Sequence, residues 1–345
     1  MRLGLGVGYF GTGMTPDETL ALTREADQLG YHSVWVAEAY GSDVVTVLSW
    51  MGAQTKQIGL GAGIMQMTAR TPAMTAMTAA TLDLLSGGRV LLGLGLSGPQ
   101  VVEGWYGSRY DRPLQRTREY VEIVRKIIGR EGPLEYDGEV FQLPLADSQG
   151  KALKLIIHPV RETIPIYLAS IGPRNIHLTG QIADGWLPAF YSPDHMHLFE
   201  PDLAAGAASA GRTLDDIDIA PTVMVSMGED LSTCFDWLRP IYGLYLGGMG
   251  SRKDNFYGKL ATRYGFEDAY LEVQEKYLSG DRYAAYQAIP EELIDATALV
   301  GPPERIASRM KRYDAAGVGM LNVHPFAGSI DDRISTLRTL KDLIG

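Results

Sequence analysis

The sequence contains a single cysteine, Cys234, among 345 residues. One cysteine excludes a disulfide framework and a cysteine-rich metal site, and it fits a reducing cytoplasm. The chain also has no apolar run of membrane-spanning length, and its first residues lack the basic segment and cleavage site of a secretory leader. We therefore expect a cytoplasmic protein that is not anchored in a membrane.

Positive charge is also scarce. The chain has 31 Lys and Arg residues against 41 Asp and Glu residues, a formal net charge of −10. This balance argues against a nucleic-acid-binding surface, although it is compatible with a local basic pocket for an anionic cofactor. A G-x-S-x-G nucleophile elbow is absent and no cysteine falls at a strand end, so nucleophilic hydrolysis has no support.

The hydrophobic and charged shares, 46% and 21%, are typical of a globular protein with a large core. The stretch from Ile58 to Pro99 shows how that core is organised. Two apolar, glycine-rich runs of strand length flank a helical pattern from Pro72 to Leu85. Strands that are apolar on both faces are typical of a parallel sheet covered by helices.

The same alternation of strands and helices continues along the chain and predicts a single-domain α/β fold, a (β/α)8 barrel. Beside the two strands just described, we expect strands over residues 3–9, 33–38, 164–170, 185–188, 217–227 and 320–324. We expect further helices over 15–30, 43–56, 113–130, 174–183, 195–210, 303–316 and 330–344.

Two insertions interrupt the predicted barrel of residues 1–345. Residues 132–163 carry a hairpin signal at Asp137-Gly138, followed by a short strand over 153–158. Residues 231–299 are mostly helical, and we expect them to lie near the barrel mouth.

Two G-x-G-x-x-G patterns follow predicted strands, at residues 6–11 and 93–98. In a dinucleotide-binding fold the helix begins on the last glycine, but here a loop separates each pattern from its helix. We interpret both as close backbone packing at the strand ends of a barrel.

The carboxyl ends of barrel strands form the mouth at which ligands bind. Glu38 and Tyr40 lie at the end of the second strand, and His324 ends the eighth. Glu38 is either a catalytic or cofactor-binding acid or a solvated rim carboxylate. His324 is either a proton donor near neutral pH or a partner of a loop carbonyl. His195 and His197 lack a third ligand, so we expect no metal site.

The segment from Ser170 to Arg174 follows the fifth strand and opens a helix. Free backbone N–H groups and the helix dipole at such a turn attract anions, and Arg174 adds positive charge. The alternative is an ordinary helix start with proline at its first position. Aromatic residues at strand ends either line an apolar pocket or fill the core under loops: Tyr9, Phe10, Trp105, Tyr106, Trp186 and Tyr191.

At these residues the chain resembles the luciferase-like monooxygenase superfamily, and within it the oxidoreductases that depend on the deazaflavin coenzyme F420. The similarity covers nearly the whole chain. Its most telling segments are LGAGIMQMTARTPAMTAMTAATLDLLSGGRVLLGLG, SGPQVVEGWYG, REYVEIVRKII and IYLASIGPRNIHLTGQIADGWLP. The resemblance implies a barrel with insertions that binds a deazaflavin at the carboxyl ends of its strands.

The resemblance also implies a set of cofactor-binding residues. A cis peptide bond at Gly63-Ile64 would lie against the central ring, Gln66 and Thr68 beside the ring or the ribityl-like chain, and the phosphate on the turn before Arg174. Arg174 would reach the phosphate or the oligoglutamate tail. The full implied set is Gly63, Ile64, Gln66, Thr68, Ser97, Gly98, Ser170, Ile171, Gly172, Pro173 and Arg174.

The sequence departs from the family pattern in two places. Several deazaflavin enzymes have histidine after the acid of the second strand, but this chain has Ala39 after Glu38. The sugar-phosphate dehydrogenases of the family carry glutamate after the fourth strand, where this chain has Gly98. The acid–base pair of those dehydrogenases is therefore missing. Glu38, Tyr40 and His324 are the candidates for proton transfer.

We therefore expect a coenzyme F420-dependent oxidoreductase that transfers a hydride between the deazaflavin C5 and a small organic substrate. Reduction of an activated C=C or C=O is favoured over alcohol oxidation. Two alternatives stay open: an FMN-dependent two-component monooxygenase, and a flavin- or deazaflavin-binding protein without turnover. We expect a homodimer because barrels of this family often pair through their early helices.

Overall fold

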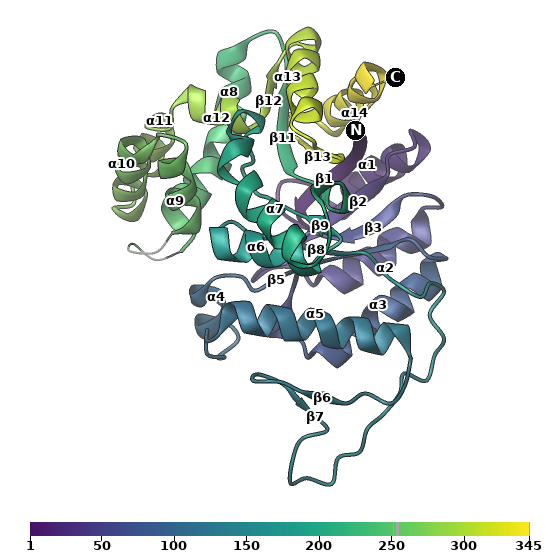
Figure 1. Ribbon diagram of the computed structural model, residues 1–345. Coiled ribbons are helices and arrows are strands. Elements are labelled where there is room, and N and C mark those ends of the chain that lie inside the picture. The colour runs from purple at the N-terminus through teal and green to yellow at the C-terminus, as the bar shows by residue number, and fades with distance from the viewer. Residues whose placement is uncertain (251, 253–254, 345) are drawn as a thin grey trace.

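The computed structural model describes residues 1–250, 252 and 255–344. Its centre is a parallel sheet enclosed by helices (Figure 1). The strands of this sheet are β1 (Arg2–Tyr9), β2 (Ser33–Ala37), β3 (Gly59–Ala62), β4 (Met65–Gln66), β5 (Val90–Gly95), β8 (Ile166–Leu168), β9 (Gly185–Trp186), β10 (Asp218–Ile219), β11 (Thr222–Met227), β12 (Leu299–Gly301) and β13 (Met320–Pro325).

The sheet runs in the order β10-β9-β8-β5-β3-β2-β1-β13-β11-β12, and β4 pairs with β5. Strands β10 and β11 are consecutive along the chain, separated only by Ala220 and Pro221. The N–H of Ala220 donates to the carbonyl of Trp186 at 2.8 Å, and the N–H of Gly319 donates to the carbonyl of Ile219 at 3.0 Å. The two sides of the sheet therefore meet at β10 and β11, which confirms the predicted barrel.

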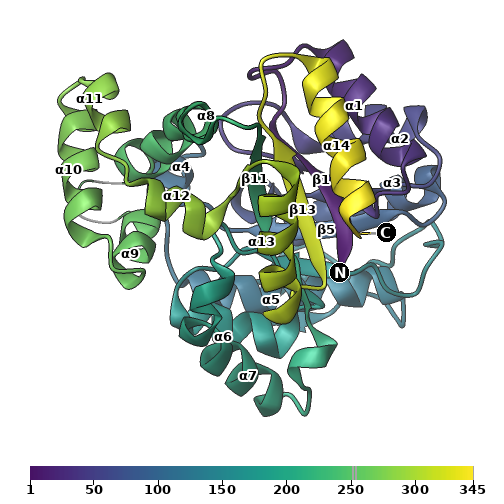
Figure 2. The same cartoon turned by 90° about the horizontal axis from the view of Figure 1, so that it is seen from above.

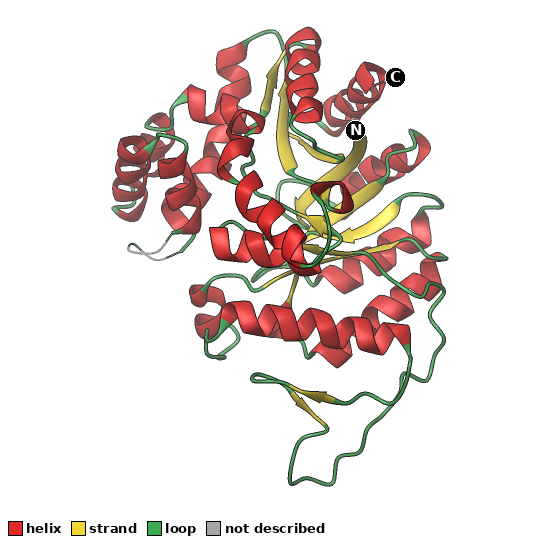
Figure 3. Cartoon of the chain, viewed as in Figure 1, coloured by secondary structure: helices red, strands yellow, loops and turns green. Residues whose placement is uncertain are grey.

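Helices cover the outside of the barrel (Figure 3). Two of them show why they begin where they do. Thr15 and Glu18 form a capping box at the first helix, and Thr71 caps the helix that opens with Pro72. The outer helices are α1 (Pro16–Gln28), α2 (Val44–Gln54), α3 (Pro72–Ser86), α4 (Pro99–Gly104), α5 (Pro113–Gly129), α6 (Pro173–Ile182), α7 (Glu200–Ser209), α13 (Pro303–Ala315) and α14 (Ile330–Ile344).

Large side chains fill the inside of the barrel, and glycines make room for them. Trp35 and Tyr167 pack edge to face there, with ring centroids 5.2 Å apart. A Cβ atom at Gly61 would lie 2.4 Å from the Trp35 ring, and one at Gly93 would lie 1.8 Å from a backbone oxygen. The glycine-rich strands are therefore a packing requirement, as the sequence suggests.

A helical segment extends from the barrel between β11 and β12 (Figure 2). Pro240 lies inside its first helix, and a π-helical turn follows directly after that helix. The segment comprises α8 (Leu231–Gly243), the π turn (Leu244–Gly248), α9 (Phe256–Arg263), α10 (Glu267–Leu278), α11 (Arg282–Gln287) and α12 (Glu291–Thr297). It contacts the barrel mouth, because the hydroxyls of Tyr245 and Tyr9 lie 3.1 Å apart.

Residues 132–163 form an extended arm below α5 (Figure 1). Strands β6 (Tyr136–Asp137) and β7 (Gln142–Leu143) pair antiparallel, so a hairpin forms as predicted. Its turn follows Gly138 instead of falling at Asp137-Gly138, because the N–H of Gly138 donates to the carbonyl of Phe141. The buried carboxylate of Glu119 on α5 accepts the N–H groups of residues 139 to 141, which ties the hairpin to the barrel.

Several details of the predicted elements are wrong. Residues 153–158 form no strand, because they have no neighbouring strand to pair with among the described residues. The helix expected over 195–210 is divided into a 3-10 turn (Pro193–Leu198) and α7, which starts one residue before Pro201. The strand expected over 217–227 is interrupted at Pro221, which has no N–H to donate. The short strand β12 was not predicted, because its three residues are too few to show a strand pattern in the sequence.

Candidate active site

The side chains of Tyr9 on β1 and His324 on β13 face into the mouth of the barrel. Trp35 of β2 points inward, so Ala37, two residues later, lies on the same face. Tyr9 is the register partner of Ala37, after a register shift between Gly6 and Gly8. Strand β13 pairs with β1 on its other side. Met320 of β13 points inward, and His324, four residues later, therefore lies on the same inner face.

The third strand of the barrel is broken at the level of the mouth. Strand β3 ends at Ala62, β4 begins at Met65, and the peptide bond between Gly63 and Ile64 is cis, as the family resemblance implies. A Cβ atom at Gly95 would lie 2.8 Å from Cδ1 of Ile64. The absence of a side chain at position 95 therefore leaves the space that Ile64 occupies.

Glu38 is buried at the end of β2, and both of its carboxylate oxygens are bonded. Arg70 donates to Oε1 and to Oε2 at 2.7 Å each. The N–H of Gln66 donates to Oε2 at 2.9 Å, and the N–H of Val44 to Oε1 at 3.3 Å. A second carboxylate, that of Asp43, accepts from Arg70 at 2.7 Å. Glu38 is therefore part of an ion-pair network, and it is not a solvated rim carboxylate.

Three buried side-chain oxygens, in β4, just after it and at the start of α6, have no hydrogen-bond partner among the described residues. They are the side-chain oxygens of Gln66, Thr68 and Asn175. Gln66 and Thr68 follow the cis peptide bond, and Asn175 lies in the first turn of α6. Because a buried polar atom without a partner is costly, each of these atoms can accept or share a hydrogen bond with a ligand.

The turn from Ser170 to Arg174 opens α6 as expected. Gly172 is the N-cap residue and makes no side-chain cap, so the first-turn N–H groups have no capping side chain. Gly172, Pro173 and Arg174 are exposed, and Ile171 is half-buried. The buried hydroxyl of Ser170 is hydrogen-bonded to the hydroxyl of Thr179 at 2.8 Å, which joins the start of the turn to α6. N–H groups at such a helix start can bind an anion.

The loop after β5 contains the other two residues implied by the resemblance. Ser97 adopts a left-handed backbone conformation with φ of 63°. Gly98 is the N-cap residue of α4, and its carbonyl accepts the N–H groups of Val101 and Val102 at 3.1 and 3.0 Å. Both residues follow the carboxyl end of β5. The loop expected between the glycine pattern over residues 93–98 and the next helix is wrong, because α4 opens directly at Gly98.

His324 is neutral at physiological pH. Burial, together with the positive charge of Arg333, lowers the pKa of its imidazole to about 4. Its ring lies 4.6 Å from that of Phe326, and a Cβ atom at Gly8 would lie 2.7 Å from its Cε1. The glycine of the first strand thus provides the space for this ring at the mouth.

The third candidate for proton transfer, Tyr40, lies in a more open position. Its side chain is 54% exposed and packs beside the exposed ring of Trp105, with centroids 6.5 Å apart. The structure therefore brings Tyr40 to the rim and places His324 on the inner face of its strand, while Glu38 is buried in its ion pair.

Sequence reasoning missed two partners. One is Arg70, although it is the only charged residue between Lys56 and Asp83, which was an available signal. The other is Tyr245, whose hydroxyl meets that of Tyr9. Burial raises the pKa of both tyrosines, so both hydroxyls keep their protons at neutral pH. No sequence signal connects two residues that are 236 positions apart.

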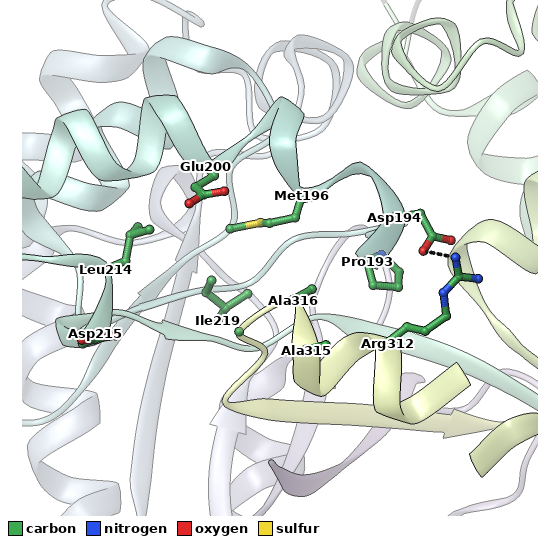
Figure 4. Close-up of a pocket in the computed structure, with 11 residues that line it drawn as sticks. Pro193, Asp194, Met196, Glu200, Leu214, Asp215, Ile219, Arg312, Ala315 and Ala316 are labelled. Atoms are coloured by element: carbon green, nitrogen blue, oxygen red, sulfur yellow. Dashed lines mark ion pairs between the residues drawn. The ribbon is translucent and has the colours of Figure 1, made fainter. Parts of the chain in front are cut away.

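A groove lies away from the mouth, between α7 and α13 (Figure 4). It has a volume of about 610 Å³, and Asp194 at its edge pairs with Arg309 and Arg312 at 2.7 Å each. Because Gly317 and Asp215 precede strands, the groove extends toward the opposite end of the barrel from the mouth. Within the described residues, we find no cluster of His, Cys, Asp or Glu that could hold a metal ion and no helix suited to crossing a membrane.

Comparison with known proteins agrees with this geometry. Residues 3–319 match the family model described as luciferase-like monooxygenase. The chain is 43% identical over 329 residues to a Mycobacterium tuberculosis protein named "Putative coenzyme F420-dependent oxidoreductase Rv3520c", with 94% of each chain covered. It is 28% identical over 319 residues to the 5,10-methylenetetrahydromethanopterin reductase of Archaeoglobus fulgidus, covering 90% of this chain and 91% of the relative.

A solved structure has the same fold. The coenzyme F420-dependent tetrahydromethanopterin reductase of Methanopyrus kandleri superposes with a TM-score of 0.82 at 23% identity, covering 99% of this chain and 98% of the other. From the family match and these relatives, we conclude that the chain belongs to the luciferase-like monooxygenase family and is an oxidoreductase of that class.

Proposed function

We propose that this protein is a coenzyme F420-dependent oxidoreductase that transfers a hydride between the deazaflavin C5 and a small organic substrate. Reduction of an activated C=C or C=O is the favoured direction. The relative named as F420-dependent supports the choice of cofactor, since it shares 43% identity over 94% of both chains.

The observation that carries the proposal is the set of buried polar atoms without partners at the strand ends. The free oxygens of Gln66 and Thr68 follow the broken third strand, and that of Asn175 lies at the uncapped start of α6. These groups fit a ligand that combines a polar ring system with an anionic tail. Gly172 and Arg174 would hold its phosphate, and Gln66 and Thr68 its ring or chain.

When bound, the deazaflavin supplies or accepts a hydride at C5. The protein's part is to orient the two reactants and to manage a proton. His324 faces the interior as a neutral imidazole, which carries one ring N–H donor and one acceptor nitrogen. Tyr40 lies at the rim, where a substrate enters. These two residues are the proposed groups for proton exchange with a substrate oxygen or carbon.

An FMN-dependent monooxygenase is the second candidate. The same free acceptors and the same helix start also suit FMN, which has a ring and a phosphate of similar chemistry. A binding protein without turnover would have the same cofactor site but no working proton donor.

The test of function is turnover of reduced F420 with a panel of enones, ketones and aldehydes. Turnover is measured as the increase in absorbance of the oxidised coenzyme. We expect substrate-dependent oxidation in the absence of oxygen. Turnover only with reduced FMN and oxygen would support the monooxygenase, and binding without turnover would support the non-catalytic protein.

We also propose that the protein is a cytoplasmic homodimer. The support for pairing is a set of exposed apolar side chains on α3 and on the arm, which a second copy would cover. The side chain of Arg161 at the end of the arm pairs with Asp83 of α3, with Nε and Oδ2 at 3.0 Å, so the two regions adjoin. The exposed residues are Met74, Met77, Leu84 and Leu85 on α3, and Leu145, Leu153, Ile156 and Val160 on the arm.

A further inference from the structure

The side-chain amide of Gln66 is held in one orientation. Its Nε2 donates to the main-chain carbonyl of Glu38 at 3.2 Å. Because a carbonyl oxygen only accepts, the amide must present its NH2 group to Glu38 and turn its oxygen the other way. Gln66 is 1% exposed, and this oxygen has no partner in the part of the chain that the structure describes. Gln66 therefore offers a fixed, buried acceptor.

The backbone of Gln66 is held by the side-chain carboxylate of Glu38. Its N–H donates to Oε2 of Glu38 at 2.9 Å. Arg70 then holds that carboxylate through two hydrogen bonds, and the side chains of Glu38 and Arg70 are 5% and 15% exposed. A carboxylate that accepts from a guanidinium and two backbone N–H groups has no free position from which to exchange a proton with a substrate.

We infer that Glu38 is a positioning residue, which with Arg70 fixes Gln66 so that its side-chain oxygen accepts a hydrogen bond from an N–H or O–H donor of the bound cofactor. This inference rests on the proposed function only in that a cofactor binds at the mouth. It removes Glu38 from the candidates for proton transfer and leaves His324 and Tyr40.

Two parts of a deazaflavin or flavin carry suitable donors: the imide N–H of the ring and the hydroxyls of the side chain. Both are hydrogen-bond donors, and the side-chain oxygen of Gln66 can accept from either of them. A cofactor methylated at the imide nitrogen lacks the first donor and keeps the second. Comparing the methylated and unmodified forms therefore distinguishes the two sources.

The experiment measures equilibrium binding of F420, FMN and N3-methyl-FMN to the full-length protein and its variants. Gln66→Met replaces the acceptor with an apolar side chain of similar length and keeps the Glu38–Arg70 pair. Glu38→Gln keeps the shape but removes the charge that holds Arg70. Gln142→Met, at an exposed position in the arm, is the matched control.

We expect Gln66→Met and Glu38→Gln each to raise the Kd of the preferred cofactor by about tenfold, while Gln142→Met leaves it unchanged. The double variant should bind little worse than Gln66→Met alone, because both changes remove the same interaction. A purely structural role of Glu38 would instead make the two effects multiply. If Gln66→Met affects the binding of FMN but not of N3-methyl-FMN, the donor is the imide; equal effects assign it to a hydroxyl.

Three results would overturn the inference. Unchanged cofactor affinity in Gln66→Met would show that the free oxygen is not an acceptor for the cofactor. Unchanged affinity in Glu38→Gln with loss of turnover would make Glu38 the proton-transfer group. Failure of the wild-type protein to bind any of the three ligands would overturn the proposed function together with the inference, whereas binding without a variant effect overturns the inference alone.

Discussion

Glu38 and Arg70 form two parallel hydrogen bonds of 2.7 Å between the end of β2 and the segment that follows β4. Arg70 also reaches Asp43, the N-cap residue of α2, at 2.7 Å. One guanidinium therefore joins a strand end, a helix start and the broken third strand. A bidentate pair of this kind defines geometry as well as adding stability.

Removing one partner of this pair should be more harmful than removing both charges. We expect Arg70→Met to lower the free energy of unfolding of the cofactor-free protein by about 3–5 kcal/mol, because it leaves a buried carboxylate without its counter-ion. The double variant with Glu38→Gln should lose clearly less than the sum of the single losses. Denaturant unfolding measures both. Arg109→Met at an exposed position should stay within about 0.5 kcal/mol, and a loss that small for Arg70→Met would contradict the account.

Close packing inside the barrel predicts a sharp difference between two glycines. A Cβ atom at Gly93 would lie 1.8 Å from the carbonyl oxygen of Ala62. Because this oxygen belongs to the backbone of a strand, relieving the clash requires a shift of the strand itself. Gly93→Ala should therefore cost more than about 4 kcal/mol or abolish soluble expression. Gly104 in α4 has no atom within 4 Å of such a Cβ, so Gly104→Ala should change stability by no more than about 1 kcal/mol. Similar thermal midpoints for the two variants would show that the interior is not packed as described.

The buried imidazole of His324 should lower the free energy of unfolding in mild acid. Burial lowers the pKa of this imidazole to about 4 in the folded chain, whereas an unfolded histidine titrates near 6.5. Between these values the unfolded state binds the extra proton, so stability falls as the pH falls from 6.5 to 4, by about 3 kcal/mol. The variant His324→Gln should lack this component. The measurement is the difference between the unfolding free energies of wild type and variant at each pH, and a difference that stays constant would contradict the prediction.

The proposed dimer predicts that charge on α3 dissociates the protein. Leu85 is 75% exposed and Ile156 on the arm is 91% exposed. Leu85→Glu should convert a dimer to a monomer in sedimentation velocity, with the circular dichroism spectrum retained, because it buries a charge at an apolar contact. The matched change Leu271→Glu, at a 52% exposed position on α10, should leave the mass unchanged. A monomeric wild-type protein would refute this part of the proposal.

The sequence was sufficient to predict most of the fold, because strand and helix periodicity is local. The helix opened by Pro72 formed at the expected place. The hairpin formed as well, but Asp137 lies in its first strand and the turn follows Gly138. The strand expected over 153–158 failed for a non-local reason, since an extended segment becomes a strand only when another strand lies beside it.

The site was predictable only one residue at a time. Glu38 was identified as an acid at a strand end, but its ion-pair partner Arg70 lies 32 residues further along the chain, beyond the break in the neighbouring third strand. The contact of Tyr9 with Tyr245 depends on how the helical segment folds back over the mouth. Pairings of this kind determine whether a carboxylate is free or bonded, and no pattern within one strand contains that information.

The most direct test of the central claim is equilibrium binding of purified protein to coenzyme F420 and to FMN, side by side. The account predicts tight binding of F420 and weak binding of FMN. The reverse preference would contradict the hydride-transfer proposal and favour the monooxygenase, and failure to bind either would show that the free acceptors near Gln66 and the open start of α6 do not form a working cofactor site.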